Sequence, residues 1–228
     1  TIAANNELGA GMQIALKDLE IRGAGNLLGG EQSGHIAGVG FDLYLRMIGE
    51  AVDAFRGEAP EDRRELRLEL PVDARIPDDY IGSERLRLEA YQKLSSAASA
   101  AAKPGAIDLV VDELLDRYGE LPPQVATLVE VSRIRRMAGR LGLNEVVAMG
   151  RVLRITQVSL PDSKQVRLRR MYPDAKYQDA QGVLTLPLPA GRVGAVVGDA
   201  EFLEWVRGVF RALFDAQPDS AEDAAPAE

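Results

Sequence analysis

The chain has 228 residues, a formal net charge of −8, no cysteine, one histidine and one tryptophan. Its length suits one large domain or two small ones, and its 46% hydrophobic and 27% charged content is typical of globular proteins. The lack of cysteine excludes disulfides, thiol nucleophiles and Cys-ligated metal sites, and any histidine-dependent site must use His35.

Residues 1–57 are predicted to form one unit, a helical hairpin with a long glycine-rich loop. Apolar residues at helical spacing predict a first helix over 11–22. Residues 23–40 contain seven glycines, a density that breaks regular structure. The helical period returns over 41–56 and stops at Gly57, so a second helix follows the loop.

Residues 58–216 are predicted to form a second, α+β unit. Residues 58–65 are polar and charged and indicate a linker. Ser83 can cap the first helix of this unit, and Pro122–Pro123 begins its third. Strands are expected from period-two alternation, and those beyond residue 145 are expected to be antiparallel. The predicted helices lie near 83–99, 106–118, 123–141 and 199–215, and the predicted strands span 66–70, 146–149, 152–158, 165–171 and 183–186.

The predicted fold class is therefore α+β: a helical hairpin with a Gly-rich loop, then a helix-rich domain with a small, mostly antiparallel sheet. The chain ends in an acidic tail, residues 217–228, which is expected to be disordered because it has little apolar surface to bury. From Asp215 onward the chain carries five acids and no base, and therefore accounts for −5 of the net charge.

A basic segment, residues 131–170, holds ten arginines and lysines against two acids, a net charge of +8. One interpretation is that these arginines cover the solvated faces of a helix and two strands. The other is a patch that contacts phosphates or an acidic partner, which would make the segment a direct nucleic-acid-binding module. The candidate contacts are Arg133, Arg136, Arg167, Arg169 and Arg170.

The glycine loop is not a typical nucleotide-binding motif. The run Gly23-Ala-Gly25-Asn-Leu-Leu-Gly29 misses the dinucleotide fingerprint by one residue and follows a helix rather than a strand, and the chain has no P-loop sequence. Carboxylates around the loop, with Arg22 nearby, could form a catalytic set. A local ion-pair network is the simpler interpretation, because the sequence offers no nucleophile–base pair and no metal cluster.

The whole string over residues 8–36, with Asp18-Leu-Glu-Ile-Arg-Gly-Ala-Gly25 and Glu31-Gln-Ser-Gly34, resembles the translocation motif of the transcription-repair coupling factor (Mfd) family, which is shared with RecG branch-migration helicases. The second unit also resembles the carboxy-terminal region of this family, in residues 70–81, 85–91 and 113–123. The resemblance is strong from residue 2 to about residue 142 and looser over 143–214.

The resemblance implies that Arg22, Gln32, Glu20 and Glu31 couple ATP hydrolysis to movement along duplex DNA. It also implies that the ATPase motifs lie upstream of Thr1, which fits a chain that starts without Met. This fragment is therefore expected not to be an enzyme and to need no cofactor. The parent is expected to be an ATP-dependent DNA translocase that uses ATP and Mg²⁺ and binds duplex DNA and RNA polymerase.

The resemblance further implies that the second unit is regulatory. In the family it packs on an amino-terminal UvrB-like module and hides the surface that recruits UvrA. On the helix near 107–118, six apolar residues are expected to face the core: Ile107, Val110, Val111, Leu114, Leu115 and Tyr118. The other face carries the residues that we expect to form the contact with the UvrB-like module, or else an ordinary solvated surface: Leu109, Asp112, Glu113 and Asp116.

The sequence gives no sign of membrane association. No apolar run approaches the roughly 20 residues of a membrane span. No basic segment followed by an apolar segment marks a signal peptide. A cytoplasmic protein without a membrane partner is therefore expected.

Overall fold

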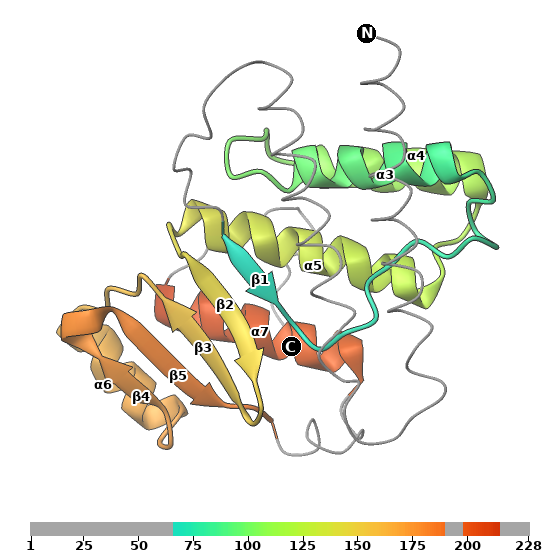
Figure 1. Ribbon diagram of the computed structural model, residues 1–228. Coiled ribbons are helices and arrows are strands. Elements are labelled where there is room, and N and C mark those ends of the chain that lie inside the picture. The colour runs from blue at the N-terminus through green and yellow to red at the C-terminus, as the bar shows by residue number, and fades with distance from the viewer. Residues whose placement is uncertain (1–65, 190–197, 215–228) are drawn as a thin grey trace, which may run out of the picture.

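The computed structural model describes residues 66–189 and 198–214 (Figure 1). The predicted hairpin of residues 1–57, the linker 58–65 and the acidic tail 217–228 lie outside these ranges. The helices are α3 (Glu84–Ala97), α4 (Ala106–Tyr118), α5 (Pro123–Arg140), α6 (Asp162–Met171) and α7 (Asp199–Phe214). The strands are β1 (Arg67–Glu69), β2 (Glu145–Met149), β3 (Val152–Thr156), β4 (Lys176–Gln178) and β5 (Val183–Pro187), with a 3₁₀ turn, η2 (Asp179–Gln181), before β5.

The five strands form one sheet in the order β1-β2-β3-β5-β4. β1 runs parallel to β2, and every other neighbouring pair is antiparallel. A two-residue connection joins β2 to β3, and Gly150 takes the positive φ of 59° there, a conformation that glycine adopts at no steric cost. The registers align two rows of buried side chains on one face of the sheet: Val146, Ile155 and Leu184, and Ala148, Leu153 and Leu186.

The core lies between that face and the helices. In Figure 1, α7 passes behind the sheet, and α5 lies between α7 and the pair α3 and α4. Phe202, Val206 and Phe210 of α7 belong to the same buried cluster as the inward residues of the sheet. Helix α5 contacts α3, α4 and α7, and it therefore connects the pair α3 and α4 to α7.

The segment between β1 and α3 has no regular structure but is fixed by buried contacts. Ile76 and Ile81 are buried, and the backbone N–H of Ile76 donates to the hydroxyl of Tyr91 at 2.7 Å. The Arg87 guanidinium donates to the carbonyl of Ile81 at 2.7 Å. These bonds satisfy backbone groups that neither a helix nor a strand satisfies here, so α3 keeps a fixed position relative to the sheet.

The α+β class, the small and mostly antiparallel sheet and the helices near 83–99, 106–118, 123–141 and 199–215 are confirmed. Pro123 starts α5 as predicted, whereas Ser83 stands at the N-cap of α3 without a capping side-chain bond. Within the described ranges, no helix has both the length and the apolar content of a membrane span.

The predicted strand over 165–171 is wrong, because these residues belong to helix α6. Val166 and Leu168 alternate with polar residues, but only Leu168 is buried, and Val166 is 63% exposed. Lys, Gln, Arg and Leu are good helix formers, and Pro161 sits at the N-cap. The short strand β4 was not predicted, because Lys176–Gln178 contains one apolar residue and therefore gives no periodic signal.

Candidate functional site on helix α4

Helix α4 begins and ends at glycines in unusual backbone conformations. Gly105 precedes it with a φ of 75°, and Gly119 follows it with a φ of 83°. Between them, Ile107 and Leu114 are buried against the core, and Val110 packs beside them. The apolar stripe therefore fixes which face of the helix points outward.

The outward face combines apolar and acidic side chains. Leu109 is 72% exposed, and Asp112 and Asp116 lie exposed on the same side of the helix. Neither aspartate forms an ion pair with another residue in the described ranges. Leu115, which was predicted to be in the core, is 43% exposed, because it lies at the edge of the buried stripe. Leu109 and Leu115 are thus exposed beside the carboxylates of Asp112 and Asp116, while the opposite face of α4 packs on the core.

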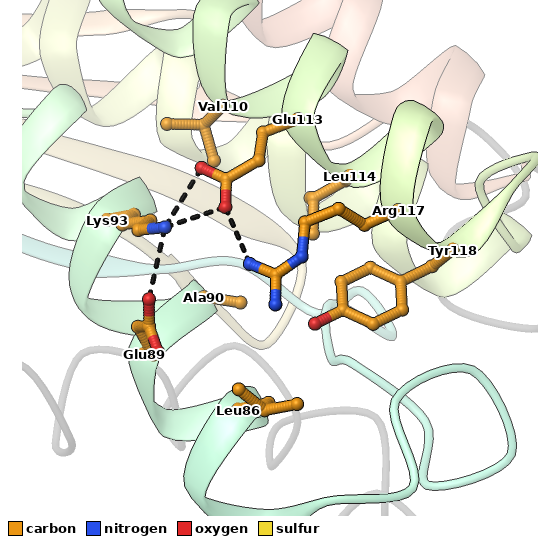
Figure 2. A pocket seen from close by; sticks show the side chains of 9 residues that line it. All are labelled: Leu86, Glu89, Ala90, Lys93, Val110, Glu113, Leu114, Arg117 and Tyr118. Carbon is orange, nitrogen blue, oxygen red and sulfur yellow. Dashed lines mark hydrogen bonds and ion pairs between the residues drawn. The ribbon is translucent and has the colours of Figure 1, made fainter.

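Glu113 has bonding partners within the domain, unlike the two aspartates. Its carboxylate accepts hydrogen bonds from Nζ of Lys93 at 2.7 and 2.9 Å and from Nη1 of Arg117 at 2.8 Å (Figure 2). Lys93 also pairs with Glu89 at 3.2 Å, so a charged network bridges α3 and α4. This network was not predicted from the sequence, although the spacing of four residues in Glu89–Lys93 and Glu113–Arg117 is a usable signal.

These hydrogen bonds shift the titration of the network. The bonds from Lys93 and then Arg117 hold the pKa of Glu113 below its ordinary value of 4.5. The same bonds to Glu113 raise the pKa of Lys93, and also that of Arg117. Glu113, Lys93 and Arg117 therefore stay charged at neutral pH.

The network closes off a shallow hollow between α3 and α4. Leu86, Ala90 and Leu114 line its apolar side, and Tyr118 stands at one end (Figure 2). The hollow has about 10 Å³ of free space, which is the size of one water and far below that of a nucleotide. Nowhere in residues 66–189 and 198–214 do three His, Cys, Asp or Glu side chains gather as a metal site requires. The hollow between α3 and α4 is therefore too small to hold a nucleotide.

A second charged chain ties α4 to the core helices. Arg133 of α5 donates to Asp108 of α4 at 2.8 Å and to Glu130 of its own helix at 2.6 Å. Glu130 also accepts a bond at 2.8 Å from Arg207 of α7. Arg133 and Arg207 are largely buried, so the interactions are less screened than those of exposed pairs. This ion-pair chain fixes the N-terminal end of α4 against α5.

The basic segment divides into buried and exposed arginines. Arg136 is 1% exposed and donates to the carbonyls of Ala97 at 3.1 Å and Ala102 at 2.8 Å, so its inclusion among phosphate contacts is wrong. Arg133 is occupied by two carboxylates, as described above. Three predicted contacts remain exposed together on α6: Arg167, Arg169 and Arg170. The predicted coupling residues lie outside the described ranges: Glu20, Arg22, Glu31 and Gln32.

Comparison with known proteins identifies the family. The model of the TRCF domain matches residues 70–168, from the end of β1 through most of α6. The transcription-repair-coupling factor of Mycobacterium tuberculosis is 49% identical in an alignment 227 residues long that covers 93% of this chain and 18% of that protein. The chain belongs to the transcription-repair coupling factor family. The chain spans about a fifth of the length of the Mycobacterium tuberculosis protein and corresponds to the carboxy-terminal region of the family.

Other members agree. The transcription-repair-coupling factor of Staphylococcus epidermidis is 41% identical over 157 residues, 68% of this chain and 13% of that protein. That of Myxococcus xanthus is 46% identical over 129 residues, 57% of this chain and 10% of that protein. A crystal structure of the C-terminal domain of a transcription-repair coupling factor superposes with a TM-score of 0.53 at 22% identity, covering 67% of this chain and 93% of that one. The superposition confirms the fold.

Lys93→Met is expected to raise the pKa of Glu113, because the variant loses the strongest bond to the carboxylate. In the unchanged chain, NMR titration of the Glu113 carboxyl should give a midpoint below 4.5. A lowered native pKa stabilises the fold above the ordinary pKa, and this contribution is lost as the pH falls through the native value. Lys103→Met, which removes an exposed lysine elsewhere, should leave the midpoint in place. An unchanged midpoint in Lys93→Met would show that the network does not exist in solution.

Glu130→Gln is expected to lower the free energy of unfolding by about 2 kcal/mol, because it leaves two largely buried guanidinium groups without their shared carboxylate. The loss stays below that of a fully buried pair, since 25% of the Glu130 side chain is exposed. Urea denaturation measures the change. Glu120→Gln, at an exposed site, is the matched control and should stay within about 0.5 kcal/mol. Equal stabilities of the two variants would contradict the role of Glu130.

Proposed function

We propose that this chain is the regulatory carboxy-terminal part of a DNA translocase that couples transcription to nucleotide-excision repair. The outer face of α4 docks on the amino-terminal UvrB-like module of the same protein and hides the surface that recruits UvrA. The observation that carries this proposal is the exposed Leu109 beside Asp112 and Asp116, which form no ion pair within the described ranges, on a helix anchored through its opposite face.

The composition of this surface fits a contact that must open. Exposed ion pairs contribute about 0.2–1 kcal/mol each, so two aspartates facing basic residues would give a weak and salt-sensitive contact. Leu109 adds apolar area to the same face. Glu113, the fourth residue of the predicted contact, is already bonded to Lys93 and Arg117 and would need to share its carboxylate with the partner. The main polar role in docking therefore falls to Asp112 and Asp116.

The proposal also assigns the chain its place in the parent. Residues 1–57 would be the end of the motor module, where Arg22 and Gln32, flanked by Glu20 and Glu31, couple ATP hydrolysis to movement on duplex DNA. ATP and Mg²⁺ would bind upstream motifs of the parent, and RNA polymerase would contact the parent as well. The fragment itself would not hydrolyse ATP.

The alternative, a direct nucleic-acid-binding module, now depends on one short helix. Arg167, Arg169 and Arg170 of α6 are exposed together, which favours an anionic ligand at this surface. Binding through so few phosphate contacts would be weak, and its salt dependence would be shallower than that of a site with about six to ten contacts, because the dependence scales with the number of phosphates.

Reversing the charges of Asp112 and Asp116 to lysine in the full-length protein is expected to increase UvrA binding several-fold, because the docking contact loses two attractive pairs and gains repulsion. UvrA binding is measured by a pull-down or by surface plasmon resonance with the motor kept in its resting state. The control variant Asp78→Lys with Asp79→Lys reverses two exposed acids outside α4 and should leave UvrA binding unchanged. UvrA binding as weak as in the unchanged protein would refute the assignment of docking to α4.

A further inference from the structure

Helix α6 presents a strongly cationic face that the proposed docking of α4 does not use. The helix carries four basic residues and one acid, Asp162, a net charge of +3 over ten residues. Arg169 and Arg170 are exposed and form no ion pair within the described ranges. Met171, at the end of the helix, is 47% exposed. Two adjacent arginines at the surface, neither in an ion pair within the described ranges, favour the binding of an anionic ligand.

The end of α7 lies directly beside this face. Nη1 of Arg167 donates to the carbonyl of Ala212 at 3.0 Å, in the last turn of α7. Carbonyls in the last turn of a helix lack intrahelical donors and carry partial negative charge, which explains why a guanidinium binds there. The described part of α7 ends at Phe214, two residues after Ala212, so the chain continues from a point close to Arg167 of α6.

The segment that continues from this point has the opposite charge. Residues 215–228 contain five carboxylates and no lysine or arginine. Asp219 stands five residues beyond Phe214, a reach of about 17 Å at about 3.4 Å per residue. Helix α6 is about 15 Å long at about 1.5 Å per residue. The acids from Asp219 to Asp223 can therefore reach every arginine on the exposed face of α6.

We infer that residues 215–228 dock on the Arg167–Arg169–Arg170 face of α6 as an internal anionic ligand. Each pair is exposed and weak, but the covalent link supplies an effective concentration of about millimolar. The tail thereby occupies the surface that an external polyanion would otherwise bind. The chain has a net charge of −8 and yet exposes these arginines. Docking of the acidic tail would neutralise them and explain this combination.

Paramagnetic NMR tests this contact in the full chain of 228 residues. Because the chain has no cysteine, Ala221→Cys introduces a unique site for a spin label between Asp219 and Glu222. At about 0.01 M salt, where the Debye length is about 30 Å, the amides of α6 should lose most of their intensity. At about 1 M salt, where it is about 3 Å, the intensity should return.

Two sets of variants separate docking from mere proximity. The double variant Arg169→Gln with Arg170→Gln should restore the α6 intensities at low salt. The matched control, Arg85→Gln with Arg151→Gln, removes the same charge from exposed sites outside α6 and should leave the broadening in place. Broadening that persists in the α6 variant, or that resists high salt, would overturn the proposal.

A binding measurement distinguishes the tail from nucleic acid as the ligand of α6. A chain that ends at residue 216 is compared with the full chain for binding a fluorescent duplex DNA at low salt. The inference predicts tighter binding without the tail, by about tenfold, and loss of that gain in the Arg169→Gln, Arg170→Gln background, because an internal ligand at millimolar effective concentration competes with the DNA. Equal affinity of both chains for DNA would show that the tail does not cover α6, and would overturn the inference.

Discussion

The carboxylate of Glu130 binds Arg133 of its own helix and Arg207 of α7, and the position of α4 depends on this arrangement. Arg207 reaches it from α7, and Arg133 connects it to Asp108 of α4. An arginine presents several donors in a planar fork, so Arg133 binds Asp108 and Glu130 through two different nitrogens. Through this chain, a helix at the edge of the domain is fixed to the helix that packs on the sheet.

Fixing α4 has a consequence for its outer face. A docking surface that must release on demand cannot gain its affinity from a large buried area, so it depends on a preorganised arrangement of few groups. Ile107 and Leu114 set the rotation of the helix, the ion-pair chain sets its N-terminal end, and the Lys93–Glu113 contact joins it to α3. Leu109, Asp112 and Asp116 are thereby displayed without any role in holding the domain together.

Much of this arrangement could be predicted from the sequence, wherever one periodic signal dominates. The outward position of Leu109 follows from the helical spacing around Ile107 and Leu114, and the structure confirms it. The segment of α6 was mistaken for a strand because its few apolar residues alternate, although a helix that buries only Leu168 shows no helical stripe either. The parallel direction of β1 has no local signal at all, since pairing partners far apart in the sequence decide it.

The placement of charged residues was harder to predict than the helices. Arg136 was counted as part of a basic surface, yet it is buried and donates to the carbonyls of Ala97, at the end of α3, and Ala102, in the turn that follows. Glu113 was assigned to an external partner, but Lys93 of the neighbouring helix binds it first. In both cases one partner lies outside the helix that carries the residue, so the spacing within that helix does not reveal it.

The central claim is that the outer face of α4 is covered in the intact protein, and hydrogen–deuterium exchange measures this most directly. Amide exchange of residues 106–118 is compared between this chain alone and the full-length protein, with residues 123–140 of α5 as the internal reference. Covering of the face predicts slower exchange of α4 in the full-length protein, and a return to the rate of the isolated chain when Asp112 and Asp116 are reversed to lysine. The same α4 exchange rate in both proteins, with α5 unchanged, would contradict the account.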